Sequence, residues 1–190
     1  VQAVLGPLVI DRLTYRQAFM NILQLDPFTA TTACLQQVAK QRLTVALAAD
    51  EPRDNWLDLL MSHCIAPALP TACFIQDYPP SQAALARVCT HQDGQSVAQR
   101  FELYIEGMEL ANGYYELTNA SEQAQRFKQD QQQRQQLGKI PMTIDPRLQA
   151  ALQAGLPDCA GVALGIERLL MLVLKQRDIN AVVSFGHLLA

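Results

Sequence analysis

The sequence lacks the features that mark a membrane-spanning, disulfide-bonded or zinc-binding protein. No apolar run reaches the roughly 18–20 residues that a helix needs to cross a bilayer. The first residues carry neither the basic flank nor the cleavage site of a signal peptide. The five cysteines form no Cys-x-x-Cys pair, and no histidine lies at ligand spacing from any of them. We therefore interpret them as reduced thiols and expect a cytoplasmic protein with no membrane partner.

The sequence also lacks a strong excess of charge of either sign. Its 15 Lys and Arg stand against 18 Asp and Glu, a net charge of −3, so the chain as a whole shows no sign of nonspecific nucleic-acid binding. No internal repeat of roughly 20–50 residues is visible. A length of 190 residues then indicates one domain, or a large piece of one.

Hydrophobic spacing predicts an α+β fold with an antiparallel sheet. Helical spacing and capping residues predict helices over 14–24, 32–41, 54–64, 119–138, 146–154 and 166–175. Apolar segments that end at turn residues predict strands over 71–77, 100–106, 108–117 and 181–185. Because helices come in blocks beside paired strands, without regular βαβ alternation, the α+β class is favoured.

The first stretch that carries chemistry is a hairpin with a two-residue turn at Glu106–Gly107. This turn predicts that Ile105 faces Met108 and that Tyr104 faces Glu109. It also predicts that Glu102 faces Ala111. Glu102 and Glu109 then lie on one sheet face as diagonal neighbours, roughly 7–8 Å apart. Two converging carboxylates suit Mg²⁺ carried by the phosphates of a nucleotide. Spacing alone favours ordinary glutamates on a solvent-facing strand, and that alternative stays open here.

The geometry of the second hairpin strand decides whether its candidate residues share one sheet face with Glu109. Strand alternation places Asn112, Tyr114 and Glu116 on the face opposite Glu109. A bulge between positions 109 and 113 would bring them to one face, and Gly113 is the natural place for it. We therefore predict a bulge, and a flat strand would exclude a single pocket.

The other stretch runs from Gly155 to Leu172. A short apolar strand ends at Gly165 and a helix begins at once, so that Arg168 falls in its first turn. A cation at that end is unfavourable for the helix dipole and calls for an anionic partner. A phosphate group is one candidate, and the adjacent Glu167 is the other.

Together these stretches resemble the class II aminoacyl-tRNA synthetases, specifically the lysyl branch. The sequence GVALGIERL at 161–169 resembles motif 3 of that class, and 101–123 resembles the strand pair before it. Residues 71–79 resemble a further strand and turn of these enzymes. The resemblance implies that residues 1–190 form the C-terminal portion of a class II catalytic domain, with 1–69 mainly helical and 70–190 as the sheet core with motif 3. The fold it implies is an antiparallel sheet flanked by helices.

The resemblance also implies the nucleotide site. In such enzymes, residues at the positions of Glu102 and Glu109 hold Mg²⁺ on ATP, and the counterpart of Arg168 clamps the γ-phosphate. Gly165 would let the backbone approach the nucleotide. The chemistry implied is attack of an amino-acid carboxylate on the α-phosphate of ATP, which gives an aminoacyl-adenylate.

The amino-acid site is implied in the same way. Asn112 would position the substrate, Tyr114 would form a pocket wall, and Glu116 would pair with the amine of a lysine-like side chain. Ala163 departs from the lysyl pattern, which has a glycine there, and its methyl would crowd an α-amino group. With 158–163 (DCAGVA), this resembles the bacterial paralogues that ligate (R)-β-lysine to a lysine of elongation factor P without using tRNA.

Two alternatives remain at this point: a lysyl-tRNA synthetase that charges tRNA with lysine, and a noncatalytic ligand-binding paralogue. Motif 1 and motif 2 are not found in the chain and precede such a segment in the family, so we expect little activity from residues 1–190 alone. The resemblance implies a homodimer for the full-length protein.

Overall fold

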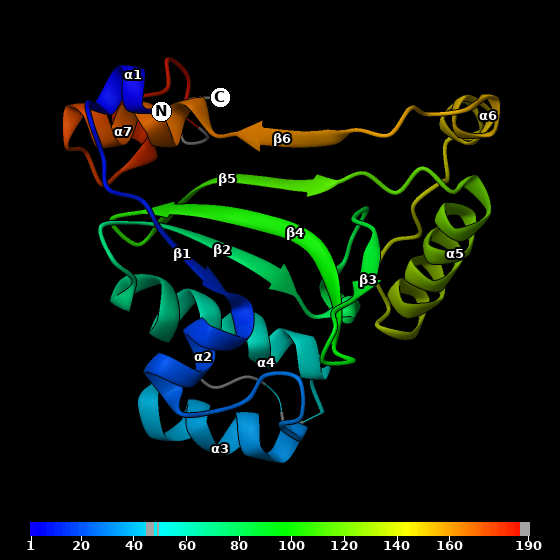
Figure 1. Cartoon of the computed structure of the whole chain (residues 1–190), viewed down its shortest axis with the longest axis horizontal. Helices are drawn as coiled ribbons and strands as arrows, with labels where there is room; N and C mark the ends of the chain where they lie inside the picture. The colour runs from blue at the N-terminus through cyan, green and yellow to red at the C-terminus, as the bar shows by residue number, and fades with distance from the viewer. Residues whose placement is uncertain (45–47, 49, 187–190) are drawn as a thin grey trace.

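The protein is described here by a computed structural model that covers residues 1–44, 48 and 50–186. Its centre is a six-stranded sheet (Figure 1), in which β1 (Asp11–Thr14), β2 (Ala72–Tyr78), β4 (Ser96–Ile105), β5 (Met108–Tyr115) and β6 (Ala160–Leu164) follow one another. β3 (Val88–Thr90) pairs beside β4. All pairings are antiparallel except that of β1 with β2. The α+β prediction with a predominantly antiparallel sheet is confirmed.

Three helices lie on one side of the sheet (Figure 1): α2 (Tyr15–Leu23), α4 (Arg53–Leu60) and, farther from the sheet, α3 (Thr32–Arg42), which packs against α4. The chain continues from α4 through a π-helical turn, Met61–Ile65, and a 3₁₀ turn, Ala66–Ala68. α2 begins at a capping box in which Thr14 and Gln17 bond each other's backbone N–H groups. The largest fully buried side chains include Trp56, Tyr15 and Phe19, so this layer forms the main core.

The other sheet face carries a smaller core of Ala72, Leu103, Ile105, Leu110 and Ala111. α1 (Gln2–Leu5) and α7 (Ile166–Leu174) pack together at one end of the molecule (Figure 1). α5 (Ala120–Gln136) and α6 (Pro146–Ala154) lie at the opposite end. None of the described helices is both long and apolar enough to pass through a membrane.

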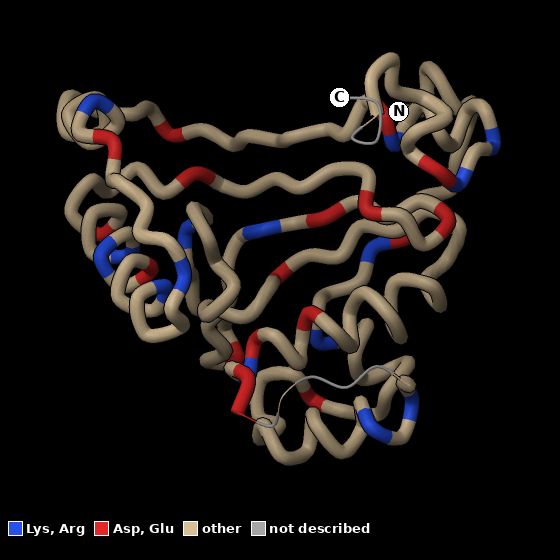
Figure 2. Tube along the Cα trace, turned by 180° about the vertical axis from the view of Figure 1, so that it is seen from behind, with Lys and Arg blue, Asp and Glu red and all other residues tan. Residues whose placement is uncertain are grey.

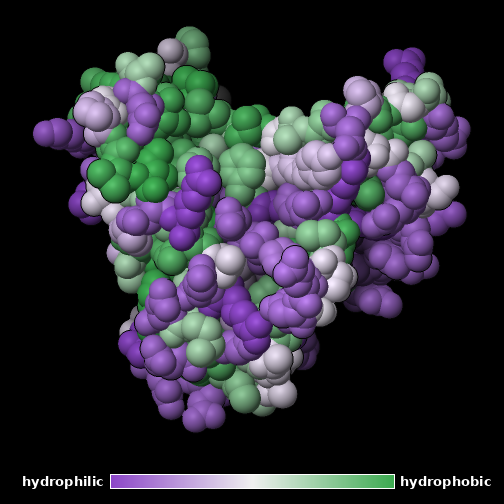
Figure 3. All heavy atoms as spheres, in the orientation of Figure 1, coloured by the Kyte–Doolittle hydropathy of each residue, from purple (hydrophilic) through white to green (hydrophobic). Residues whose placement is uncertain are grey.

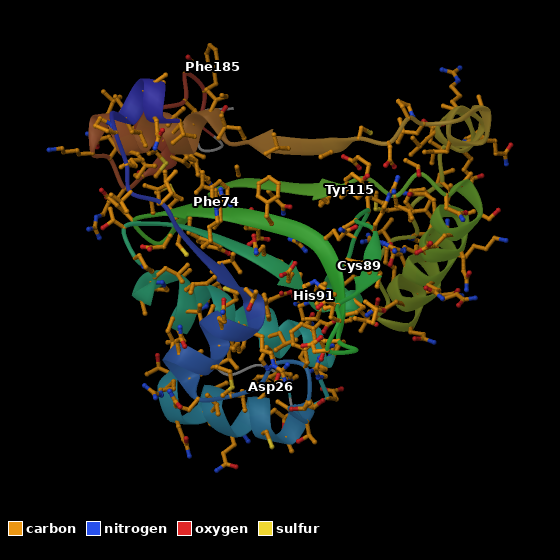
Figure 4. All side chains as sticks on the ribbon, viewed as in Figure 1. Asp26, Phe74, Cys89, His91, Tyr115 and Phe185 are labelled. Atoms are coloured by element: carbon orange, nitrogen blue, oxygen red, sulfur yellow. The ribbon has the colours of Figure 1, made fainter. Side chains whose placement is uncertain are left out.

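Two details differ from the sequence-based expectations. β1 lies within the segment expected to be mainly helical, and it is held by parallel pairing with β2, a long-range contact that no local pattern reveals. The predicted strand 181–185 is wrong: a 3₁₀ turn, Ile179–Ala181, is followed by irregular chain. No neighbouring strand pairs with this segment in the described part of the chain, and Phe185 is 85% exposed and points outward (Figure 4). An apolar run without a pairing partner does not form a strand.

Candidate active site

The β4–β5 hairpin contains a bulge that decides which side chains share a face. Beyond the turn, Ile105 pairs with Met108 and Tyr104 with Glu109, as predicted. The register then shifts, and Glu102 pairs with Asn112 and not with Ala111 as the unshifted hairpin predicts. The bulged residue is therefore Leu110 and not Gly113.

This bulge brings the two halves of β5 into one pocket wall. Residues that pair directly across a sheet point to the same face, so Glu109 lies beside Tyr104, Asn112 beside Glu102, and Tyr114 beside Arg100. A bulge is the condition that the single-pocket hypothesis required. The face contains the acidic and amide groups that the sequence singled out.

Glu102 is the centre of a buried polar network. Its carboxylate accepts hydrogen bonds from Arg100 Nη2 at 2.5 Å, from the Tyr104 hydroxyl at 2.6 Å and from Asn112 Nδ2 at 3.4 Å. Glu102 is 6% exposed, so the alternative of an ordinary solvent-facing glutamate is wrong at this position. A buried carboxylate without such partners would be costly.

Arg100 and Tyr104 are site residues that the sequence analysis missed. Both lie two positions from Glu102 on the same strand, so strand alternation was the signal that could have found them. The Arg100 guanidinium also stacks over the Tyr78 ring at 4.7 Å and donates to the Gln82 carbonyl at 2.9 Å. Figure 2 shows that charged residues stand on the central strands of the sheet as well as on its rim.

Arg168 lies in the first turn of α7 and contacts Glu109, not the adjacent Glu167. Its Nη1 donates to the Glu109 carbonyl at 2.7 Å and lies 3.7 Å from Glu109 Oε2. Burial raises the pKa of Glu109, and the charge of nearby Glu102 raises it further, while Arg168 opposes the shift. Two carboxylates that repel each other in this way form a place that a cation would stabilise.

A cleft of about 470 Å³ opens beside Glu109 and Arg168, and its lining also includes Tyr104 and Arg177. Two guanidinium groups and a helix N-terminus around one cleft suit phosphate groups. A somewhat larger cavity of about 560 Å³ lies between α5 and α6. It contains none of the residues that the sequence singled out, so the smaller cleft is the candidate nucleotide site.

The residues present fit a Mg²⁺ ion that arrives with a nucleotide. Glu102 and Glu109 would supply carboxylate oxygens, the ligands that Mg²⁺ prefers, and phosphates and water would complete its shell. The described residues contain no group of three or more His, Cys, Asp or Glu that could hold a metal ion alone. The pair is thus suited to a shared ion and not to an all-protein cage.

At the other end of the same face, β6 completes the candidate amino-acid site. Asn112 pairs with Ala163 and Tyr114 with Gly161, so both β6 residues lie on the site face. Glu116 reaches over Gly161 so closely that a Cβ there would overlap its carboxylate oxygen Oε1. The structure therefore places Asn112, Tyr114, Glu116 and Ala163 together.

Two of these groups are open to a cationic ligand. The Oδ1 atom of Asn112 is buried and has no hydrogen-bond partner, although buried acceptors are normally satisfied. Among the described residues, no hydrogen bond or ion pair involves the half-buried Glu116 carboxylate. An ammonium group, which has donors only, would satisfy both acceptors.

The antiparallel sheet, the two glutamates and the strand–glycine–helix with its arginine are features of one class of protein. The chain belongs to the class II tRNA synthetases of the D, K and N group, whose family model matches residues 6–188.

Particular relatives within this class share one name, elongation factor P–(R)-β-lysine ligase. The chain is 46% identical over 188 residues to the one from Pseudoalteromonas translucida, which is 97% of this chain and 57% of that protein. It is 46% identical over 178 residues to that of Vibrio cholerae, covering 92% and 54%. It is 44% identical over 190 residues to that of Salmonella gallinarum, covering 97% and 57%. The chain thus spans little more than half the length of these curated relatives.

Proposed function

We propose that the full-length protein uses ATP to activate (R)-β-lysine as an adenylate and transfers it to a lysine of elongation factor P. The observation that carries the proposal is the Leu110 bulge, which brings Glu102, Glu109, Asn112 and Glu116 onto one sheet face. The names of the relatives support the substrate and the acceptor. The proposal includes a cytoplasmic homodimer that does not use tRNA.

In the proposed first step, the substrate carboxylate attacks the α-phosphorus of ATP, the bond to the bridging oxygen breaks, and pyrophosphate leaves. Arg168 would move from Glu109 to the γ-phosphate, which offers a stronger anionic partner. Glu102 and Glu109 would hold Mg²⁺, which neutralises phosphate charge. Catalysis then rests on positioning and on charge stabilisation.

In the proposed second step, the amine of the acceptor lysine attacks the adenylate carbonyl. An amide bond forms, AMP leaves, and the amine loses a proton. Glu116 and Asn112 would hold the substrate amines during both steps, because a desolvated ammonium needs a carboxylate or amide oxygen. Ala163, which lies beside Asn112, would discriminate between lysine and β-lysine by crowding an α-amino group.

We further propose that this chain supplies only part of the active site. β6 has one paired neighbour, β5, and leaves its other edge free within the described sheet. Several large apolar side chains of β6 and α7 are exposed: Val162, Leu164, Ile166, Leu170, Val173 and Leu174. Figure 3 shows apolar residues gathered over α1 and α7. Such a surface is typical of one that further chain covers, so residues 1–190 alone are expected to form little adenylate.

The test supplies the full-length protein with ATP and labelled (R)-β-lysine or lysine, in the presence of elongation factor P or tRNA. We expect label on elongation factor P from β-lysine, and none on tRNA. Transfer to tRNA would overturn the proposal in favour of a lysyl-tRNA synthetase. The Ala163→Gly variant is the matched probe of selectivity and should accept lysine more readily; an unchanged preference would remove Ala163 from the site.

A further inference from the structure

Three side chains from separate segments meet at the end of β5. Tyr115 is the last residue of β5, Arg87 directly precedes β3, and Asp158 lies in the chain between α6 and β6. The Arg87 guanidinium lies 4.4 Å above the Tyr115 ring centroid and forms an ion pair with Asp158. The Tyr115 hydroxyl donates to the other Asp158 oxygen. We call these three residues the β5 latch; Figure 4 labels Tyr115.

The β5 latch holds the backbone of Glu116 from both sides. Arg87 Nε donates to the Glu116 carbonyl at 2.8 Å, and its Nη2 donates to Thr118 Oγ1 at 2.9 Å. The N–H of Glu116 donates to the carbonyl of Cys159 at 3.0 Å. Because Cys159 directly follows Asp158, the contacts of Asp158 also position the Cys159 carbonyl that accepts the Glu116 N–H.

The chain before β6 depends on this latch for its position. Residues 155–158 are exposed, and the Asp158 side chain itself is 63% exposed. Among the described residues, the side-chain hydrogen bonds of this segment are those of Asp158 with Arg87 and with Tyr115 of β5. Arg87 is held more firmly than Asp158. Its side chain is only 27% exposed, its N–H donates to the Tyr115 carbonyl, and its carbonyl accepts from the N–H of Gln99.

The position of the Glu116 carboxylate therefore has two determinants. One is its own backbone, which the β5 latch and an antiparallel bridge to Ala86 hold, and the other is Gly161, whose missing side chain leaves room for it. A carboxylate with no side-chain partner of its own depends on such indirect support to hold one geometry.

We propose that Arg87 and Asp158 are positioning residues that set the Glu116 carboxylate at the distance required to bind the substrate's amine. The inference rests on the proposed function, in which Glu116 binds that amine. The competing explanation is that the contacts of Arg87 and Asp158 only stabilise the fold. The test separates the two explanations by comparing affinity for the amino acid with affinity for ATP.

The experiment measures pyrophosphate exchange by the full-length protein with Asp158→Asn and Arg87→Gln. Both variants should raise KM for β-lysine about tenfold, since a misplacement of roughly 1 Å can cost that much or more. KM for ATP should stay unchanged, because the Arg168 cleft lies at the other end of β5. Asp158→Asn is the safer variant, since its exposed side chain contributes little to folding.

Arg53→Gln is the matched control. Its side chain is 31% exposed, close to the 27% of Arg87, and its guanidinium also donates to backbone carbonyls, those of Ala30 and Pro27, far along the chain from Glu116. We expect this variant to lower thermal stability without changing KM for β-lysine. If Arg53→Gln raises that KM as much as the latch variants do, the latch contacts only stabilise the fold and the inference is wrong.

A double variant links the effect to Glu116. Glu116→Gln should by itself raise KM for β-lysine, and adding Arg87→Gln should then cause no further rise. An effect of Glu116→Gln together with unchanged KM in both latch variants would overturn the inference and leave the proposed function standing. No effect of Glu116→Gln would overturn the proposed role of Glu116, and the inference with it.

Discussion

Two neighbouring glycines, Gly161 and Gly113, allow the site to be perturbed in two different ways. A methyl group added at Gly161 would approach Glu116 Oε1 to well under 3.0 Å, a separation that Cβ atoms essentially never show. The obstacle is the end of a flexible side chain, which can move. A methyl group at Gly113 would instead lie 2.5 Å from the Gly161 carbonyl oxygen and 2.7 Å from Phe101 Cζ. A neighbouring backbone and a packed ring cannot give way in the same manner.

The expected magnitudes follow from what has to move. In Gly161→Ala, the Glu116 carboxylate must shift by roughly 1 Å to regain normal contact. A shift of this size should weaken binding of a lysine-like substrate about ten- to a hundredfold, which corresponds to roughly 1.4–2.8 kcal/mol. In Gly113→Ala, overpacking should cost about 1–3 kcal/mol of folding stability.

The assay pairs pyrophosphate exchange at varied β-lysine with thermal unfolding, both on the full-length protein. Gly161→Ala should raise KM for β-lysine while Tm stays within about 2 °C of the parent, whereas Gly113→Ala should lower Tm by roughly 2–4 °C per kcal/mol. The reasoning would be refuted if Gly161→Ala left the KM unchanged, or if it destabilised the fold as much as Gly113→Ala.

Three further predictions concern the other end of the site and helix α2. Arg168→Ala should raise KM for ATP about ten- to a hundredfold, the effect of losing a charged hydrogen bond, with KM for β-lysine unchanged; equal effects on both would contradict a phosphate role. Glu109→Gln should raise Tm of the ligand-free protein at pH 7, because burial and the charge of Glu102 raise the folded-state pKa of Glu109 above its ordinary value, so that its charge opposes folding. That gain should disappear as the pH falls through the raised pKa toward the ordinary pKa of a glutamate, and a Tm difference that grows toward acid pH would show the opposite sign. Thr14→Ala should remove the capping box of α2 and cost about 1 kcal/mol, measured by thermal unfolding; no loss would mean that the cap is redundant.

The hairpin turn could be predicted because its chemistry is local. Glu106 and Gly107 both have positive φ, 51° and 76°, which is the backbone of a two-residue hairpin turn. The first two cross-strand pairs follow from this turn, and they were predicted correctly. Helices α2 and α3 were predictable for the same reason, since Thr14 and Thr31 cap them through bonds three residues away.

The position of the bulge could not be predicted, because distant contacts determine it. Leu110 is 1% exposed in the smaller core, and its carbonyl accepts the N–H of Gly165 at 2.9 Å. A bulged residue has no cross-strand partner for its backbone hydrogen bonds. For Leu110, the N–H of Gly165 at the junction of β6 and α7 satisfies the carbonyl instead. Gly113 was chosen from backbone freedom alone, whereas its structural role is close contact with Phe101 and Gly161.

By itself, the sequence determined the α+β class, the hairpin, the strand–glycine–helix at its end and the kinds of chemical group that the site contains. All of these follow from periodicity, capping and turn chemistry within a few residues. Only the tertiary structure decided which of these groups contact one another. Arg168 forms an ion pair with Glu109, and Arg100 and Tyr104 donate hydrogen bonds to Glu102. Arg87 donates to the backbone carbonyl of Glu116. The tertiary structure also left residues 181–185 without a strand to pair with. These outcomes depend on which segments meet in space, and a burial or hydrogen bond between distant residues leaves no periodic trace in one chain.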